Sequence, residues 1–232
     1  MGAASAETSE RKSTLELRDA LVRSGMIGPA DDLDDPSSTR RRVLEAAIRL
    51  FADRGFDACT MRDLGREVGV KAPAIYNYYE SKEHILAAAS RDALRRFMTA
   101  VFGPLAEDPE DERFKRVVRR WVIFQIEERD IARANDAMID TGALKRLLPK
   151  EDWEGIADSL RLLLALVASL IEPVPEGIDE QLLVSSIAAV CDRSWRSLGR
   201  GKKLSKEEIA DEVWELCRRM ADSAEPGLNP AG

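Results

Sequence analysis

Hydrophobic positions recur every three or four residues along most of the chain, which is the spacing of an amphipathic α-helix. Near the start of this pattern, Val43, Ala47 and Leu50 fall on one helical face, and Gly55 follows as a helix end. Alternating runs of β-branched residues, which would indicate strands, are scarce. The pattern therefore predicts an all-α protein.

Glycine, proline and capping residues divide this pattern into separate helices. We expect helices over residues 14–23, 38–54, 60–68, 71–79, 82–101, 111–128, 130–140, 151–171, 179–198 and 205–221.

The segment before the strong pattern, residues 1–36, has a polar start, the short helix expected over 14–23, and an acidic loop. Its composition favours a partly ordered tail. The alternative is that Leu15, Leu17, Leu21 and Val22 dock on the rest of the protein.

Composition describes a globular chain of 232 residues, with 44% hydrophobic and 33% charged residues. The longest nearly apolar run, 162–171, is half of the roughly 20 residues that cross a bilayer. The first residues do not resemble an export signal, so we expect a cytoplasmic protein with no membrane partner. Cys59, Cys191 and Cys217 lack metal-site or paired spacing and are interpreted as reduced core thiols.

Charge is distributed unevenly. The whole chain carries −7, but residues 37–97 contain twelve Lys and Arg against eight Asp and Glu, which is +4 and leaves −11 for the rest. A basic segment inside an acidic protein suits a DNA-binding module attached to a body that phosphates repel.

A helix-turn-helix is predicted at residues 60–79. Thr60 offers a capping hydroxyl with the carboxylate of Asp63 three residues later, which marks a helix start. Gly65 then permits close helix approach, Gly69 permits a turn with positive φ, and Ile75 supplies an apolar plug. The next helix would present a cation, an amide and small groups suited to a major groove.

The surrounding residues resemble the DNA-binding signature of the TetR family. They are RRVLEAAIRLFADRGF at 41–56, Thr60, VGV at 68–70, Ile75-Tyr76 and YESKE at 79–83, and the likeness covers residues 40–87. Two positions depart from the family pattern: Lys71 stands for a small hydroxyl residue and Pro73 for a small residue. The resemblance and the helix-turn-helix geometry together predict DNA contacts at Arg40, Arg41, Arg42, Thr60, Arg62, Lys71, Ala72, Pro73, Tyr76, Asn77, Tyr78 and Lys82.

The resemblance also implies an N-terminal three-helix DNA-binding domain followed by a helical domain for effector binding and dimerisation. The expected divisions are the extension 1–36, the DNA-binding domain 37–86, the effector and dimer domain 87–222, and a tail 223–232. The expected partners are a palindromic double-stranded DNA operator, a small, largely hydrophobic effector and a second copy of the chain. The family favours repression over activation.

Two sets of residues in the second domain are candidates, one for ligand binding and one for the dimer interface. Both sets could instead be ordinary core, because apolar helix faces pack far more often than they bind ligands. The stretch from Trp121 to Ala137 resembles acyl-CoA-responsive members of the family. The ligand candidates are Phe97, Phe102, Trp121, Phe124, Gln125, Met138 and Trp153, and the dimer candidates are Leu160, Leu163, Leu164, Val167, Leu183, Ile187 and Val190.

Other classes of function fit less well. The chain has a single histidine, His84, and lacks GxSxG, GxxxxGK[ST] and HExxH, so no catalytic residue, metal site or cofactor is expected. A helical scaffold that has lost DNA contact is the remaining alternative, and Pro73 and the acidic total charge keep it open.

Overall fold

The structure is a computed structural model that describes residues 12–28, 35, 37–139, 142–197 and 204–222, apart from the side chains of 135–139, 143 and 197. Within these ranges the chain is helical and contains no strand, which confirms the all-α prediction. None of the helices in the same ranges is long and apolar enough to cross a membrane. The predicted tail, 223–232, lies outside the described residues.

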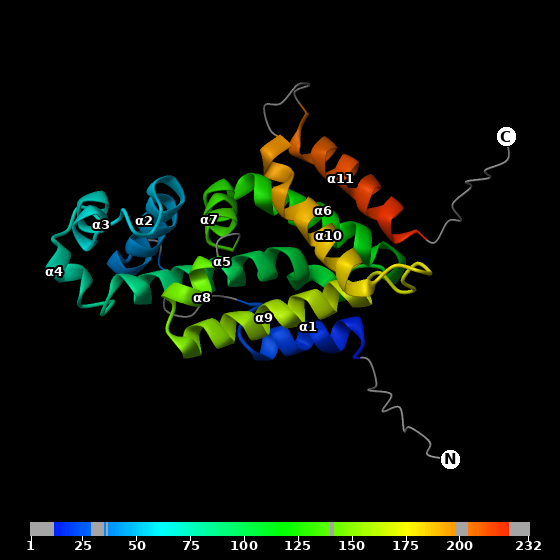
Figure 1. Ribbon diagram of the computed structural model, residues 1–232, viewed down its shortest axis with the longest axis horizontal. Coiled ribbons are helices and arrows are strands. Elements are labelled where there is room, and N and C mark those ends of the chain that lie inside the picture. The colour runs from blue at the N-terminus through cyan, green and yellow to red at the C-terminus, as the bar shows by residue number, and fades with distance from the viewer. Residues whose placement is uncertain (1–11, 29–34, 36, 140–141, 198–203, 223–232) are drawn as a thin grey trace, which may run out of the picture.

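Three helices form a small unit at one end of the molecule (Figure 1). These are α2 (Thr39–Arg54), α3 (Met61–Val68) and α4 (Ala72–Ile75). The last is shorter than the helix expected over 71–79, because residues 76–78 form a turn. Pro73 lies in its first turn, where a missing amide donor breaks no helical hydrogen bond.

A single long helix, α5 (Lys82–Phe102), leads from this unit into the body. The Ser81 hydroxyl caps its start by accepting from the amide of His84. Apolar side chains such as Ile85 and Val101 are buried along its whole length. The domain boundary expected at residue 86 therefore falls inside one continuous helix.

The body is built around α6 (Arg113–Glu127), which packs against α5 and two later helices. Its Trp121 lies edge-on to Phe97, with ring centroids 4.9 Å apart, and Phe102 and Phe124 join this aromatic cluster. One short helix, α8 (Ala143–Leu147), was not expected, because it is too short to show periodicity. The other elements are η1 (Gly103–Ala106), η2 (Glu110–Glu112), α7 (Arg129–Ile139), α8 (Ala143–Leu147), α9 (Lys150–Ser169), α10 (Glu180–Arg193), η3 (Ser194–Ser197) and α11 (Lys206–Ala221).

The N-terminal extension contains a helix, α1 (Thr14–Arg23), that lies along α9. Leu17 and Leu21 are buried there, and the Thr14 hydroxyl donates to the Ser169 hydroxyl at 2.9 Å. For this helix the structure therefore agrees with the docking alternative at Leu17 and Leu21, and not with the favoured interpretation of a partly ordered tail. Val22, one of the residues expected to dock, is 42% exposed.

Shortening a docked side chain of α1 should destabilise the whole protein. Leu21 is fully buried, so Leu21→Ala is expected to lower the free energy of unfolding by about 2 to 5 kcal/mol in urea denaturation. Its exposed neighbour provides the control, and Val22→Ala should change stability by less than about 0.5 kcal/mol. If both substitutions changed the free energy of unfolding equally little, α1 would not be part of the folded body.

Candidate functional site

The start of α3 is fixed by a reciprocal cap. The Thr60 hydroxyl accepts from the Asp63 amide at 3.2 Å, and the Asp63 carboxylate accepts from the Thr60 amide at 3.0 Å. Hydrogen bonds from the Thr60 side chain and amide hold the pKa of the Asp63 carboxyl below its usual value. The capping box expected from the sequence is thus formed.

The turn between α3 and α4 depends on two glycines. A Cβ at Gly65 would lie 2.6 Å from the Val70 carbonyl oxygen and 3.2 Å from the Ala72 amide nitrogen, so the backbones approach too closely for any side chain. Gly69 turns the chain with φ of 75°, and Ile75 is fully buried against the unit. The roles predicted for all three residues are confirmed.

The outer face of α4 and the turn that follows it is open to solvent. Tyr76 and Tyr78 are 53% and 47% exposed, which is unusual for large aromatic side chains. Ala72 is half-buried. The other exposed residues predicted to contact DNA from α3, α4 and the flanking turns are Thr60, Arg62, Lys71, Pro73 and Asn77.

Lys82 does not face outward, contrary to its predicted role as a phosphate contact. Its ammonium donates to the carbonyl oxygens of Phe56 and Cys59 at 2.8 and 2.9 Å. It also lies 4.1 Å from the centroid of the Phe56 ring. Lys82 therefore stabilises the connection between α2 and α3, and the prediction is corrected on this point.

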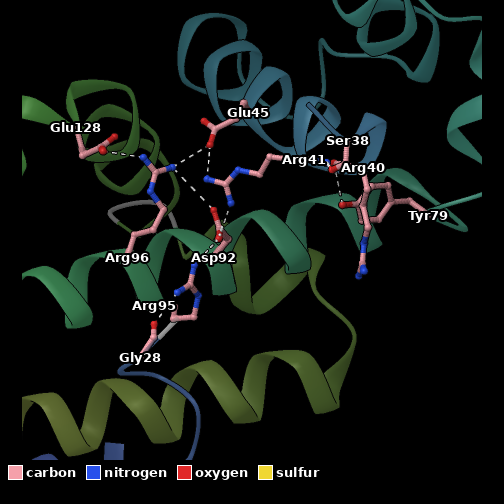
Figure 2. A network of polar contacts seen from close by, with 10 residues as sticks. All are labelled: Gly28, Ser38, Arg40, Arg41, Glu45, Tyr79, Asp92, Arg95, Arg96 and Glu128. Carbon is pink, nitrogen blue, oxygen red and sulfur yellow. Dashed lines mark hydrogen bonds and ion pairs between the residues drawn. The ribbon is translucent and has the colours of Figure 1, made fainter. Parts of the chain in front are cut away.

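Two of the three arginines at the start of α2 are likewise engaged within the protein. Arg41 forms ion pairs with Asp92 and Glu45, and Arg42 donates to the Val68 carbonyl at the end of α3. These contacts correct the expectation for Arg41, whose side chain is only 15% exposed, whereas Arg42 is exposed and its phosphate contact stays a prediction. Arg40 is exposed, and its guanidinium lies 5.9 Å from the Tyr79 ring centroid (Figure 2).

Asp92 on α5 is the centre of this network, with a side chain only 1% exposed. It lies 2.9 Å from the Arg41 guanidinium of α2, 3.2 Å from that of Arg95 and 3.9 Å from that of Arg96 (Figure 2). Burial alone would lower the pKa of the Arg41 guanidinium, but the charges and hydrogen bonds of Asp92 and Glu45 outweigh it and raise the pKa. The network thus fastens α2 to α5.

Two of its arginines extend the network to other parts of the chain. Arg96 binds Glu45 of α2 at 3.1 Å and Glu128, which follows α6, at 2.7 Å. Arg95 donates to the Gly28 carbonyl of the N-terminal extension at 2.8 Å. Sequence reasoning missed Asp92, although an acidic residue within a largely apolar helix face, three and four residues before two arginines, was a usable signal.

The body contains a cavity of about 360 Å³ among α5, α6, α9 and α10. Most of its lining is apolar, with leucines of α9 on one side and Leu94 and Phe97 of α5 on another. Its polar lining includes Gln125 of α6 and Asp192 of α10.

Three of the seven predicted ligand contacts, Phe97, Trp121 and Gln125, line this cavity. Phe102 and Phe124 pack in the aromatic cluster instead, and Trp153 is half-buried elsewhere. The Met138 side chain lies outside the described residues. Asp192, which the sequence prediction missed, accepts hydrogen bonds from Trp121 and Gln125.

The predicted dimer residues separate into two groups. Only Leu164 is exposed, at 39%, while Leu160 and Val190 are half-buried, and Leu160 and Leu164 line the cavity. The remaining four were wrongly assigned to a surface, because their apolar faces pack within this chain. They are Leu163, which also lines the cavity, Val167, Leu183 and Ile187.

Residues 43–89 match the family model for bacterial regulatory proteins of the tetR family. The match covers the unit whose cap, glycine turn and exposed helix face are described above. The N-terminal domain of this chain belongs to the tetR family. The tetR domain is thus α2 to α4 together with the first two turns of α5.

Curated relatives share mainly this domain. The HTH-type transcriptional repressor KstR2 of Rhodococcus jostii is 35% identical over 79 residues, which are 34% of this chain and 37% of the relative. The chain thus aligns with little more than a third of that relative's length.

Solved structures share the fold across the tetR domain and the body. A tetR-family regulatory protein from Rhodococcus RHA1 superposes with a TM-score of 0.69 at 23% identity, covering 82% of this chain and 100% of that one. AibR in complex with isovaleryl coenzyme A and operator DNA superposes with a TM-score of 0.65 at 17% identity, covering 77% and 97% of the two chains.

Adding one methyl group at the tetR domain's turn should disrupt it. Gly65→Ala is expected to cost about 1 to 3 kcal/mol of stability in urea denaturation, because the Cβ would collide with backbone rather than with a movable side chain. Gly155 lies in α9, where an added Cβ would meet no atom within 4 Å, so Gly155→Ala should stabilise by about 0.5 to 1 kcal/mol. A change in the free energy of unfolding with the same sign in both variants would contradict the turn geometry.

Neutralising the buried carboxylate of Asp92 should loosen the contact between α2 and α5. Asp92→Asn leaves three arginines without their shared counter-charge and is expected to lower the free energy of unfolding by about 3 kcal/mol. The control is Asp152→Asn, whose partner Arg91 is 49% exposed, and it should cost less than about 1 kcal/mol. Chemical denaturation of the two variants side by side gives the comparison, and similar losses would refute the role assigned to Asp92.

Proposed function

We propose that this chain is a homodimeric, sequence-specific transcriptional repressor that leaves a palindromic operator when a small, largely hydrophobic effector enters its body. The observation that carries the proposal is the exposed face of α4 and its flanking turns, where Tyr76, Asn77 and Lys71 stand clear of the core. Exposed aromatic, amide and cationic side chains on a helix-turn-helix are the groups that contact phosphates and base edges.

Base contacts in this proposal come from Lys71, Ala72, Pro73 and Asn77. Tyr76 and Thr60 contact backbone phosphates, and Arg62 and Tyr78 lie beside the groove. Arg40 extends the contact surface from the start of α2. Because Arg41 and Lys82 have partners inside the protein, they support this surface without touching DNA.

Dimerisation follows from the small area that one short helix offers. A two-fold pair contacts half-sites about 34 to 36 Å apart and multiplies specificity. We place the dimer contact on α10 and α11, which run side by side in opposite directions (Figure 1). Leu182 and Leu216, on these two helices, are 63% and 53% exposed.

Release by an effector follows from the shared use of α5. Asp92 on this helix holds the tetR domain, and Leu94 and Phe97, only a few residues further on, line the cavity. A molecule that alters the packing of Phe97 would therefore shift the tetR domains relative to each other. By thermodynamic linkage, operator and effector weaken each other's binding by the same factor.

The direct test is selection of bound sequences from a random duplex pool with purified protein, followed by a salt titration on the selected duplex. A palindrome with half-sites one helical turn apart, whose affinity falls steeply with salt, supports the proposal. No enrichment by a folded dimer would favour the scaffold alternative.

Removing the exposed ring of Tyr76 should weaken operator binding without affecting the fold. Tyr76→Ala is expected to cost about 1 to 3 kcal/mol of binding free energy in a fluorescence-anisotropy titration. Ile178 is 44% exposed in the loop before α10, and Ile178→Ala should bind the operator as the wild type does. Unchanged affinity for Tyr76→Ala would remove this residue from the interface.

Charge on the proposed dimer face should separate the protomers. Leu182→Glu combined with Leu216→Glu is expected to convert the dimer to monomer in sedimentation velocity, because each substitution would bury an unpaired carboxylate. Val22→Glu, which changes an exposed apolar residue of α1, should remain dimeric. A double variant that stays dimeric would place the interface elsewhere.

A further inference from the structure

One residue of the cavity's polar lining carries a buried acceptor without a hydrogen-bond partner among the described residues. Gln125 is 4% exposed and lines the cavity, yet its Oε1 has no hydrogen-bond partner among the described residues. Buried amide oxygens are normally paired, because an unpaired one loses its hydration without compensation.

The orientation of this amide is fixed by its neighbours. The Asp192 Oδ1 accepts from the Trp121 indole N–H at 2.8 Å and from the Gln125 Nε2 at 2.7 Å. Exchanging the Gln125 nitrogen and oxygen would set two acceptor oxygens against each other, so the nitrogen must face Asp192. The Gln125 oxygen is therefore the group left over for another donor.

We propose that the cavity takes a largely apolar molecule whose polar end donates a hydrogen bond, such as a neutral alcohol, and disfavours one whose polar end only accepts. The donor would pair with Gln125 Oε1, while leucines of α9 and the aromatic rings of Phe97 and Trp121 enclose the apolar part. This inference rests on the proposed function only in treating the cavity as the effector site.

The same arrangement disfavours two other classes of ligand. A carboxylate would face both the Gln125 oxygen and the Asp192 carboxylate, and the carbonyl of a simple ester would meet the same two acceptors. Arg193 also borders the cavity, but it is exposed, so an anion bound there would leave Gln125 Oε1 unpaired.

Three probes built on the same ten-carbon chain separate these classes: decanol, methyl decanoate and decanoate. Each is titrated into the purified full-length protein without DNA, with tryptophan fluorescence and calorimetry as readouts. Decanol should bind about tenfold more tightly than either acceptor-only probe, which corresponds to one hydrogen bond to a buried group. Equal or tighter binding of decanoate or methyl decanoate would overturn the proposal, and so would binding of none of the three.

A pair of glutamine variants assigns the preference to one atom. Gln125→Met keeps the volume but removes the acceptor, so the preference for decanol should fall to within about threefold of methyl decanoate. Gln181 is exposed on α10, and Gln181→Met should keep the wild-type preference. A preference that survives in Gln125→Met would also overturn the proposal. Operator selection needs no ligand, so its success alongside a failed probe series would leave the proposed function intact.

Discussion

The buried carboxylate of Asp92 is the constraint on which the geometry of the DNA-binding end depends. A charge with 1% of its side chain exposed is tolerated only where opposite charges surround it, and Arg41, Arg95 and Arg96 do so from two helices. Because Arg41 belongs to α2, any rotation of the tetR domain about α5 would separate these charges. The domain is therefore held in one orientation by electrostatics as well as by apolar packing.

One helix performs two tasks in this architecture. The middle of α5 carries Asp92, Arg95 and Arg96 of the network, and Phe97 beside them contributes to the cavity and to the aromatic cluster. The N-terminal extension reinforces this arrangement, since Arg95 is held by the Gly28 carbonyl while α1 covers α9. A change in cavity packing thus has a short, continuous path to the tetR domain.

Sequence reasoning succeeded where the interacting groups are neighbours in the chain. The cap of Thr60 and Asp63 and the turn at Gly65 and Gly69 each involve residues a few positions apart, so spacing alone predicted them. It failed where the interacting groups are far apart in the sequence. Lys82 and Arg41 had the right charge for DNA contact, but carbonyl and carboxylate partners 23 and 51 positions away hold them inside the protein.

Local spacing was equally insufficient to predict the packing of the body. An apolar helix face looks alike whether it packs internally, lines a cavity or meets a second copy, so Leu163 and Ile187 were placed on a surface although they belong to the core. Likewise, periodicity predicted α1 but gave no sign that α9 lies beneath it. Long-range packing decides these cases, and a single sequence does not encode it in local spacing.

The central claim, that two rigidly held tetR domains form a single spaced pair, can be tested by a distance between labels. Arg66 on α3 is 73% exposed and the native cysteines Cys59, Cys191 and Cys217 are buried, so Arg66→Cys accepts a spin label selectively. On the selected operator, pulsed dipolar spectroscopy should give one narrow distribution consistent with half-sites about 34 to 36 Å apart. A broad distribution, or no dipolar coupling between protomers, would contradict the account.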